Sequence, residues 1–103
     1  MIFRTNKITN YTKIDNKYLK DKNISLKAKG LLTLMLSLPD GWKFNINGLC
    51  LLCKESKDAV NNAIKELKEN HYVEIEKTYD DNGRFIYEYY IYENPDDTKT
   101  NLD

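Results

Sequence analysis

Residues 56–70 of the chain read SKDAVNNAIKELKEN. Small and apolar side chains recur in this segment with the spacing of an α-helix, so they fall on one face. They are Ala59, Val60, Ala63, Ile64 and Leu67. Ser56 suits the N-cap position, because a serine hydroxyl can accept a hydrogen bond from an amide of the first helical turn. The pattern predicts an amphipathic helix from Ser56 to about Asn70, with a polar outer face.

A shorter helix is predicted immediately before this one. Asn45 can cap it, and Phe44 can pack against an apolar residue of its first turn. Its apolar side comprises Leu49, Leu52 and Cys53. A break at residues 53–55 then leads to Ser56. Two short helices joined by a tight turn, the second with Asn and Lys on its outer face, are typical of a helix-turn-helix.

A longer helix is predicted upstream, with Ser25 as its N-cap and residues 39–41, Pro-Asp-Gly, as its stop. Its apolar positions are Leu26, Leu31, Leu34, Met35 and Leu38. Residues 17–22 suit a single helical turn that Asp15 or Asn16 can cap. These helices together supply a hydrophobic core.

After Tyr72 the hydrophobic period changes from 3.6 to 2, which indicates a strand. Residues 84–92 are predicted to form the returning strand, with Asn82-Gly83 as a two-residue hairpin loop. This loop places Lys77 opposite Glu88. It also predicts one face that pairs Val73 and Ile75 with Tyr92 and Tyr90. The other face would pair Glu74, Glu76 and Thr78 with Ile91, Tyr89 and Tyr87.

The predicted order is one irregular strand over residues 2–14, then the helices, then the hairpin. This order predicts an α+β fold of the winged helix-turn-helix class, in which a three-helix core carries a C-terminal β-hairpin as its wing. Residues 1–94 are predicted to be one domain. Residues 95–103 are expected to be a disordered tail or the stub of a linker.

Four short segments carry a family resemblance. They are LKAKGLL at 26–32, LSLPDGW at 36–42, Glu66-Leu67 leading to Tyr72, and Gly83-Arg84. Over about residues 3–95 the chain resembles the N-terminal winged-helix domain of DnaD-like and plasmid or phage replication-initiator proteins of Gram-positive bacteria. The resemblance implies a domain that binds DNA, oligomerises or does both, and that is often followed by further domains.

The chain departs from this family at three places. Glu55-Ser56 and Asn70-His71 stand where relatives tend to have glycine. Glu74 and Glu76 stand early in the first wing strand, where relatives tend to have a basic residue. Two carboxylates there would repel phosphate, which argues against contact between the wing and a DNA backbone.

The charges are unevenly distributed, although 16 basic and 16 acidic residues give a formal net charge of zero. Residues 1–29 hold eight basic and two acidic side chains, whereas residues 66–103 hold four basic and eleven acidic ones. Such asymmetry can orient a domain on a phosphate backbone, and it can equally drive head-to-tail self-association.

The helix-turn-helix pattern and the resemblance predict double-stranded DNA as a partner. On the outer face of the 56–70 helix, amide side chains can read adenine, and lysines can contact phosphate or guanine. The predicted DNA-binding residues are Lys27, Lys29, Lys54, Ser56, Lys57, Asn61, Asn62, Lys65 and Arg84. A homodimer would present two such helices about one helical turn of DNA apart. The alternative is an ordinary solvated helix face, since residues 54–69 hold four lysines and four acids.

A second hypothesis assigns the chain to protein assembly, with little or no direct DNA binding. In this interpretation an aromatic wing strand packs on another protomer of a homo-oligomer or on a replication protein. The predicted surface consists of Phe85, Tyr87, Tyr89 and Ile91. Neutral overall charge and an acidic wing favour it.

The sequence predicts no enzyme, cofactor, metal site or small-molecule substrate. Cys50 and Cys53, together with His71, are one ligand short of a closed zinc site. Buried thiols in a reducing compartment explain both cysteines. No nucleophile and carboxylate arrangement surrounds His71. The sequence has no apolar run long enough to span a membrane and no signal peptide, so a cytoplasmic location is expected.

Overall fold

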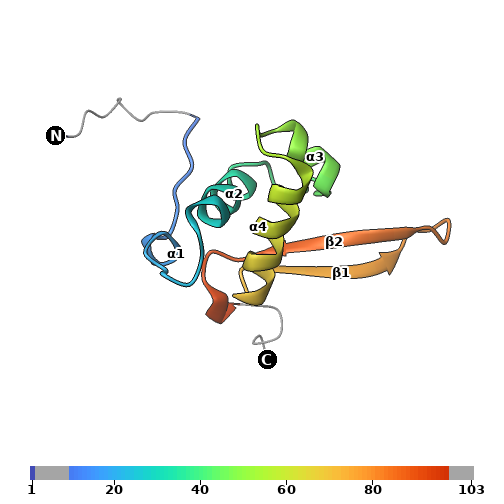
Figure 1. Ribbon diagram of the computed structural model, residues 1–103. Coiled ribbons are helices and arrows are strands. Elements are labelled where there is room, and N and C mark those ends of the chain that lie inside the picture. The colour runs from blue at the N-terminus through green and yellow to red at the C-terminus, as the bar shows by residue number, and fades with distance from the viewer. Residues whose placement is uncertain (2–9, 98–103) are drawn as a thin grey trace.

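The computed structural model describes residue 1 and residues 10–97 (Figure 1). Its elements are α1 (Asn16–Leu19), α2 (Leu26–Leu36), α3 (Ile46–Leu51), α4 (Lys57–Glu69), β1 (Val73–Tyr79), β2 (Phe85–Ile91) and the 3₁₀ turn η1 (Pro95–Asp97). Within this part of the chain, the protein is a small α+β domain in which a helical body carries one antiparallel hairpin that extends away from it (Figure 1). The arrangement is compatible with the predicted winged helix-turn-helix.

Each helix begins where a side-chain oxygen can accept a hydrogen bond from its first turn. Ser25 accepts from the amide of Ala28 at 3.1 Å and thereby caps α2. Asn45 caps α3 and Ser56 caps α4 in the same way, accepting at 2.7 and 3.2 Å. Asp15 caps the short α1. These caps and the helices that they start are confirmed, except that α1 covers Asn16–Leu19 and not the predicted residues 17–22.

The core lies between α4 and the elements that pack on it, namely α2, α3 and β1. The predicted stripe of α4 faces this core: Val60, Ala63, Ile64 and Leu67 are buried, and Ala59 lies at its margin. The remaining buried core residues are Tyr18, Ile24, Ala28, Leu31, Leu32, Met35, Leu49, Tyr72 and Val73.

Two apolar residues that the sequence assigned to buried faces are exposed instead. Leu52 is 43% exposed, because α3 ends at Leu51 and Leu52 lies past the last helical turn. Leu26 is 84% exposed. It is the first residue of α2, and a helical period places it on the side away from the buried Ala28 and Met35.

The start of α1 lies against the segment that follows β2. The amide of Asp15 donates to the Glu93 carboxylate at 2.9 Å, and the ammonium of Lys17 pairs with Asp96 at 3.2 Å. The first residues of the predicted tail therefore form the turn η1 against α1, and residues 98–103 lie outside the described residues. The predicted first strand lies mostly outside them too, and residues 10–14 form no strand.

The register of the hairpin differs from the prediction by one residue. Lys77 pairs with Tyr87, not with Glu88, and Ile75 pairs with Tyr89, not with Tyr90. The loop has three residues instead of two, closed by hydrogen bonds between Asp80 and Arg84. The Asp80 amide donates to the Arg84 carbonyl and the Arg84 amide donates to the Asp80 carboxylate, each at 2.9 Å.

Gly83 makes this longer loop possible. Its φ of +77° lies in the left-handed region, and its amide donates to the Asp80 carbonyl at 3.0 Å. A turn followed by a left-handed glycine is the usual form of a three-residue hairpin loop. The sequence interpretation gave both Asn82 and Gly83 to a two-residue turn, and the additional residue shifts every cross-strand pair.

The shift changes which side chains share a face, because directly opposed residues of an antiparallel pair point to the same side. The inner face of the hairpin carries Val73, Ile75, Lys77 and Tyr79 with Phe85, Tyr87, Tyr89 and Ile91. The outer face carries Glu74, Glu76 and Thr78 with Ile86, Glu88 and Tyr90. The predicted pairing of the aromatic strand with Glu74 and Glu76 is therefore wrong.

Candidate nucleic-acid interface

One flank of α4 is basic and amide-bearing. Lys57, Asn61, Lys65 and Lys68 recur at helical spacing and are all exposed. We call these four residues the basic flank. Asp58, Asn62 and Glu69 lie further round the helix, away from the core. Glu66 lies on the opposite flank, where its carboxylate accepts hydrogen bonds from the amide and the hydroxyl of Ser25.

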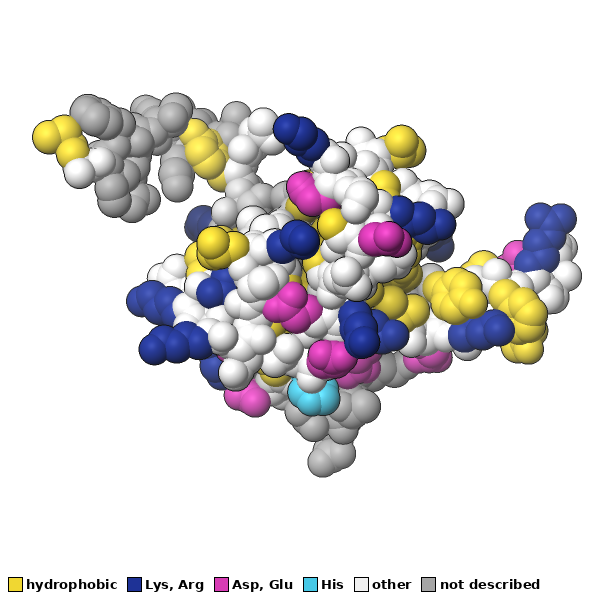
Figure 2. Space-filling view, in the orientation of Figure 1, with side chains coloured by type: hydrophobic (Ala, Val, Ile, Leu, Met, Phe, Trp, Pro, Cys, Tyr) yellow, Lys and Arg dark blue, Asp and Glu magenta, His cyan; other side chains and the backbone are white. Residues whose placement is uncertain are grey.

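Three residues of the basic flank, Asn61, Lys65 and Lys68, form one wall of a groove, and the inner face of the hairpin forms the other. The groove has a volume of about 430 Å³. It is lined by Asn45, Ile46, Asn61, Ile64, Lys65, Lys68, Ile75, Tyr87 and Tyr89. Figure 2 shows basic side chains gathered where the helical body meets the hairpin, with apolar side chains continuing along the hairpin. The structure thus places Asn61 and Lys65 beside aromatic rings of the hairpin.

The predicted aromatic surface is divided between core and solvent. Tyr89 packs against Phe44, with ring centroids 5.8 Å apart, and burial raises the pKa of the Tyr89 hydroxyl. Ile91 is half-buried against the core. Phe85 and Tyr87 are 56% and 58% exposed. Only the half of the surface nearer the hairpin loop is therefore available to a partner.

Three exposed rings cluster at that end of the hairpin, and we call Tyr79, Phe85 and Tyr87 the aromatic tip. Tyr79 is 63% exposed, and its ring centroid lies 4.8 Å from that of Phe85. The ammonium of Lys77 lies 3.8 Å from the centre of the Phe85 ring, a cation–π contact. Cations therefore accompany the rings on the inner face.

The hairpin acids that argued against phosphate contact lie on the other face. Glu74 and Glu76 share the outer face with Glu88, which pairs directly with Glu76. The inner face between the core and the loop carries Lys77 and no carboxylate among its paired residues. The repulsion expected from the sequence is therefore directed away from the groove.

Other predicted contact residues are dispersed over the surface. Lys54 and Ser56 are exposed at the turn before α4, where the Ser56 oxygen already accepts the capping hydrogen bond. Arg84 is exposed beside the hairpin loop. Lys54, Ser56 and Lys57 thus lie at the start of α4 and Arg84 lies at the far end of the hairpin, and none of them lines the groove. Asn62 points further outward on α4 than Asn61 does.

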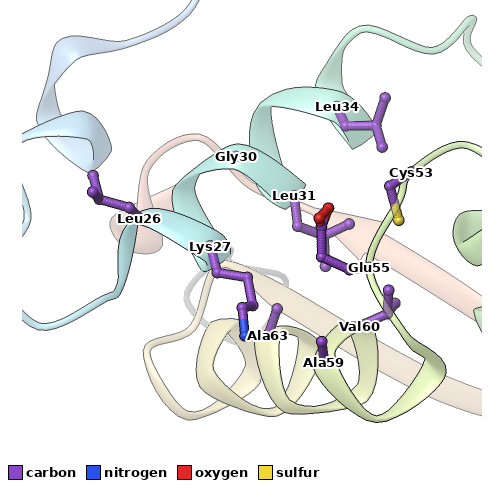
Figure 3. A pocket seen from close by; sticks show the side chains of 10 residues that line it. All are labelled: Leu26, Lys27, Gly30, Leu31, Leu34, Cys53, Glu55, Ala59, Val60 and Ala63. Carbon is purple, nitrogen blue, oxygen red and sulfur yellow. The ribbon is translucent and has the colours of Figure 1, made fainter.

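The two predicted residues of α2 lie away from the groove. Lys27 lines a separate, mainly apolar groove of about 490 Å³ between α2 and α4, on the Ala59 and Ala63 side of α4 (Figure 3). Lys29 lies on the other flank of α2, towards Asp21, whose pKa is lowered by a hydrogen bond from Tyr72 and, to a smaller extent, by the charge of Lys29. The structure does not bring Lys27 or Lys29 together with the basic flank.

Two cations of this surface are absent from the predicted DNA-binding residues. Lys68 follows Lys65 by three positions and Asn61 by seven, a helical spacing that places all three on one flank. That signal was available in the sequence. The place of Lys77 beside the rings depends on the hairpin register. With a two-residue loop, Phe85 and Tyr87 would lie on the opposite face of the hairpin from Lys77.

The cysteines and the histidine form no site. Cys50 and Cys53 are free and half-buried, and the Cys53 thiol donates to the Leu49 carbonyl at 3.3 Å. His71 follows the C-cap of α4 in the left-handed conformation, with φ of +68°. No three His, Cys, Asp or Glu side chains within the described chain are placed to hold a metal ion. The described helices also include none with the length and apolarity to cross a bilayer.

Comparison with known proteins finds no matching family model, no matching curated protein and no matching solved structure.

Proposed function

We propose that the chain is a winged helix-turn-helix module that binds double-stranded DNA, with α4 as the recognition helix and the hairpin as the wing. The observation that carries the proposal is the groove in which Asn61, Lys65 and Lys68 face the inner side of the hairpin. A helix with exposed amide and ammonium groups suits a major groove, because amides pair with adenine and cations pair with guanine or phosphate.

In this proposal the side chains of α4 have two roles, base recognition and phosphate contact. Asn61 and Asn62 read base edges, while Lys57, Lys65 and Lys68 contact phosphates. The position of Lys57 supports a binding role. It is the first residue of α4, where a positive charge opposes the helix dipole, so helix stability does not account for it.

A net charge of zero is compatible with this role, because affinity depends on the charges that meet the backbone. Asn61, Lys65 and Lys68 line the groove and Lys77 lies on the inner face of the hairpin, while Glu66 and the hairpin acids face elsewhere. The proposed setting is the initiation of replication, with a homodimer on DNA, and it rests on the sequence resemblance to DnaD-like proteins.

The test is a titration of duplex DNA, followed by fluorescence anisotropy at several salt concentrations. We expect affinity to fall as salt rises, and the Lys65→Gln/Lys68→Gln variant to bind more weakly, with a log–log salt slope smaller by about 2. The matched control is Lys20→Gln/Lys22→Gln, which makes the same change of charge beside α1, across the body from the hairpin (Figure 1).

Two results would reject the proposal. One is the absence of duplex binding at low salt, or binding that does not respond to salt. The other is an equal loss of affinity in the groove variant and in the control variant, since this would show that net charge matters and the groove does not.

A second candidate function is assembly through the hairpin, favoured by the exposed rings of the aromatic tip. Sedimentation velocity of the wild type and of Tyr87→Glu examines it. Self-association of the wild type that disappears in Tyr87→Glu would support assembly, and a wild type that stays monomeric would reject it.

A further inference from the structure

We infer that the aromatic tip stacks on unpaired bases, so that the preferred partner of the groove is a duplex that continues into a single strand. This inference rests on the proposed function, because α4 holds the duplex part. In this inference the hairpin has its own ligand, namely the flat faces of unpaired bases and the phosphates next to them.

The first reason is the exposure of the rings. Tyr79, Phe85 and Tyr87 are 56–63% exposed, although each has a large apolar area. A paired base already has both of its faces covered by neighbours in the stack, so a duplex offers these rings little. An unpaired base offers a free face, and stacking on an aromatic ring is a sequence-tolerant way to bind it.

The second reason is the placing of cations among the rings. Lys77 lies over Phe85, and Lys65 and Lys68 line the groove that Tyr87 enters. Rings that alternate with cations are the usual arrangement for single-stranded nucleic acid, in which the bases stack and the phosphates meet the positive charges. The central parts of protein–protein interfaces are instead depleted of lysine. The mixture therefore favours nucleic acid over another protein.

The third reason is continuity. Tyr87 lines the groove beside the basic flank and also belongs to the aromatic tip. Phe85 lies two residues before Tyr87 in β2, nearer the hairpin loop and on the same face, about 7 Å away at the rise of a β-strand. A single DNA strand that leaves the duplex at α4 can therefore pass from Tyr87 to Phe85 without crossing the acidic outer face of the hairpin.

The experiment compares three DNAs that share one duplex. The first is blunt, the second carries an overhang of about six nucleotides, a length within known single-strand site sizes, and the third carries an abasic overhang of equal length. The abasic strand keeps the phosphates and lacks the bases. Overhangs of both polarities are measured. We expect the overhang with bases to bind about 10-fold more tightly than the other two, as stacking on one or two rings would give.

Two protein variants separate stacking from general apolarity. Tyr79→Leu/Phe85→Leu keeps apolar side chains and removes the flat faces of two rings that do not line the groove, and we expect it to weaken the preference while it binds the blunt duplex as the wild type does. Tyr79→Phe/Phe85→Tyr keeps both rings and should keep the preference. Circular dichroism and the melting temperature check that both variants fold, which their exposed positions lead us to expect.

Each outcome decides the matter. Equal binding of blunt and overhang DNA overturns the inference and leaves the proposed function standing, as does a preference that the leucine variant retains in full or that the abasic overhang shares. Failure to bind any duplex rejects the proposed function and the inference with it. Loss of self-association in the leucine variant, without a change in DNA preference, would assign the rings to a protein interface and overturn the inference.

Discussion

Tyr72 joins two parts of the chain that lie far apart in the sequence. It is buried directly before β1, and its hydroxyl donates to the Asp21 carboxylate at 2.6 Å. Its ring also meets that of Tyr18 edge-on, with centroids 6.3 Å apart. Burial raises the pKa of Tyr72, and the hydrogen bond from Tyr72 lowers the pKa of Asp21. One phenol thereby ties the turn after α1 to the start of the hairpin.

We expect Tyr72→Phe to lower the free energy of unfolding by about 1–2 kcal/mol at pH 7, since a hydrogen bond to a charged group is lost and Asp21 is partly exposed. The pKa of Asp21 is lower in the folded state than in the unfolded state, so the stabilisation is present above the ordinary carboxyl pKa of about 4. It is lost as the pH falls through the lowered value.

Urea denaturation of both proteins between pH 7 and pH 3 measures this effect. The difference between wild type and Tyr72→Phe should shrink on acidification. A difference that is constant over this range would show that the ionised Asp21 does not contribute.

At the scale of elements, Ser25 and Ser56 both cap helices but are not equivalent. The Ser25 hydroxyl and amide also donate to the carboxylate of Glu66, which joins the start of α2 to α4. Loss of a serine cap alone costs about 1 kcal/mol. We expect Ser25→Ala to destabilise the domain by more than Ser56→Ala does, as measured by urea denaturation.

A double-mutant cycle identifies the source of the additional loss. If it comes from the contact between helices, Ser25→Ala should cost less in a Glu66→Gln background, whereas the cost of Ser56→Ala should not change. Equal costs for the two serines in the wild-type background would contradict the argument.

The hairpin loop makes another prediction at this scale. Gly83 has φ of +77°, and no heavy atom lies within 4 Å of where a Cβ would stand. Backbone strain, and not crowding, therefore determines how far a side chain at position 83 would lower the free energy of unfolding. We expect Gly83→Ala to destabilise the domain by about 1–2 kcal/mol and Gly83→Asn by less, because Asn tolerates the left-handed region better. Thermal denaturation measures both, and equal losses would argue against this loop conformation.

At the scale of the whole molecule, binding and stability are linked. If duplex DNA binds only the folded state, a concentration 100-fold above Kd stabilises the domain by about 2.7 kcal/mol. We expect thermal denaturation to show this gain for the wild type and for Lys20→Gln/Lys22→Gln, and a smaller gain for Lys65→Gln/Lys68→Gln at the same DNA concentration. Equal gains in stability for the wild type and both variants would show that DNA binding does not depend on Lys65 and Lys68.

Local patterns were sufficient for most of the helical body. Ser25, Asn45 and Ser56 cap helices because a side-chain oxygen satisfies amides a few residues away, an interaction that needs no distant partner. The buried stripe of α4 follows from helical spacing in the same way. Helical spacing also places Asn61, Lys65 and Lys68 on one flank.

What the sequence by itself determined, then, is the order of the helices and the hairpin, the helix starts and the polar flank of α4, because each depends on contacts within a few residues. Tertiary structure decided the hairpin register, since a local sequence with Asn82-Gly83 suits a two-residue turn as well as the three-residue loop that forms. Because side chains of a strand alternate between its faces, that one residue moved Phe85, Tyr87 and Tyr89 onto the face of Lys77 and away from Glu74 and Glu76.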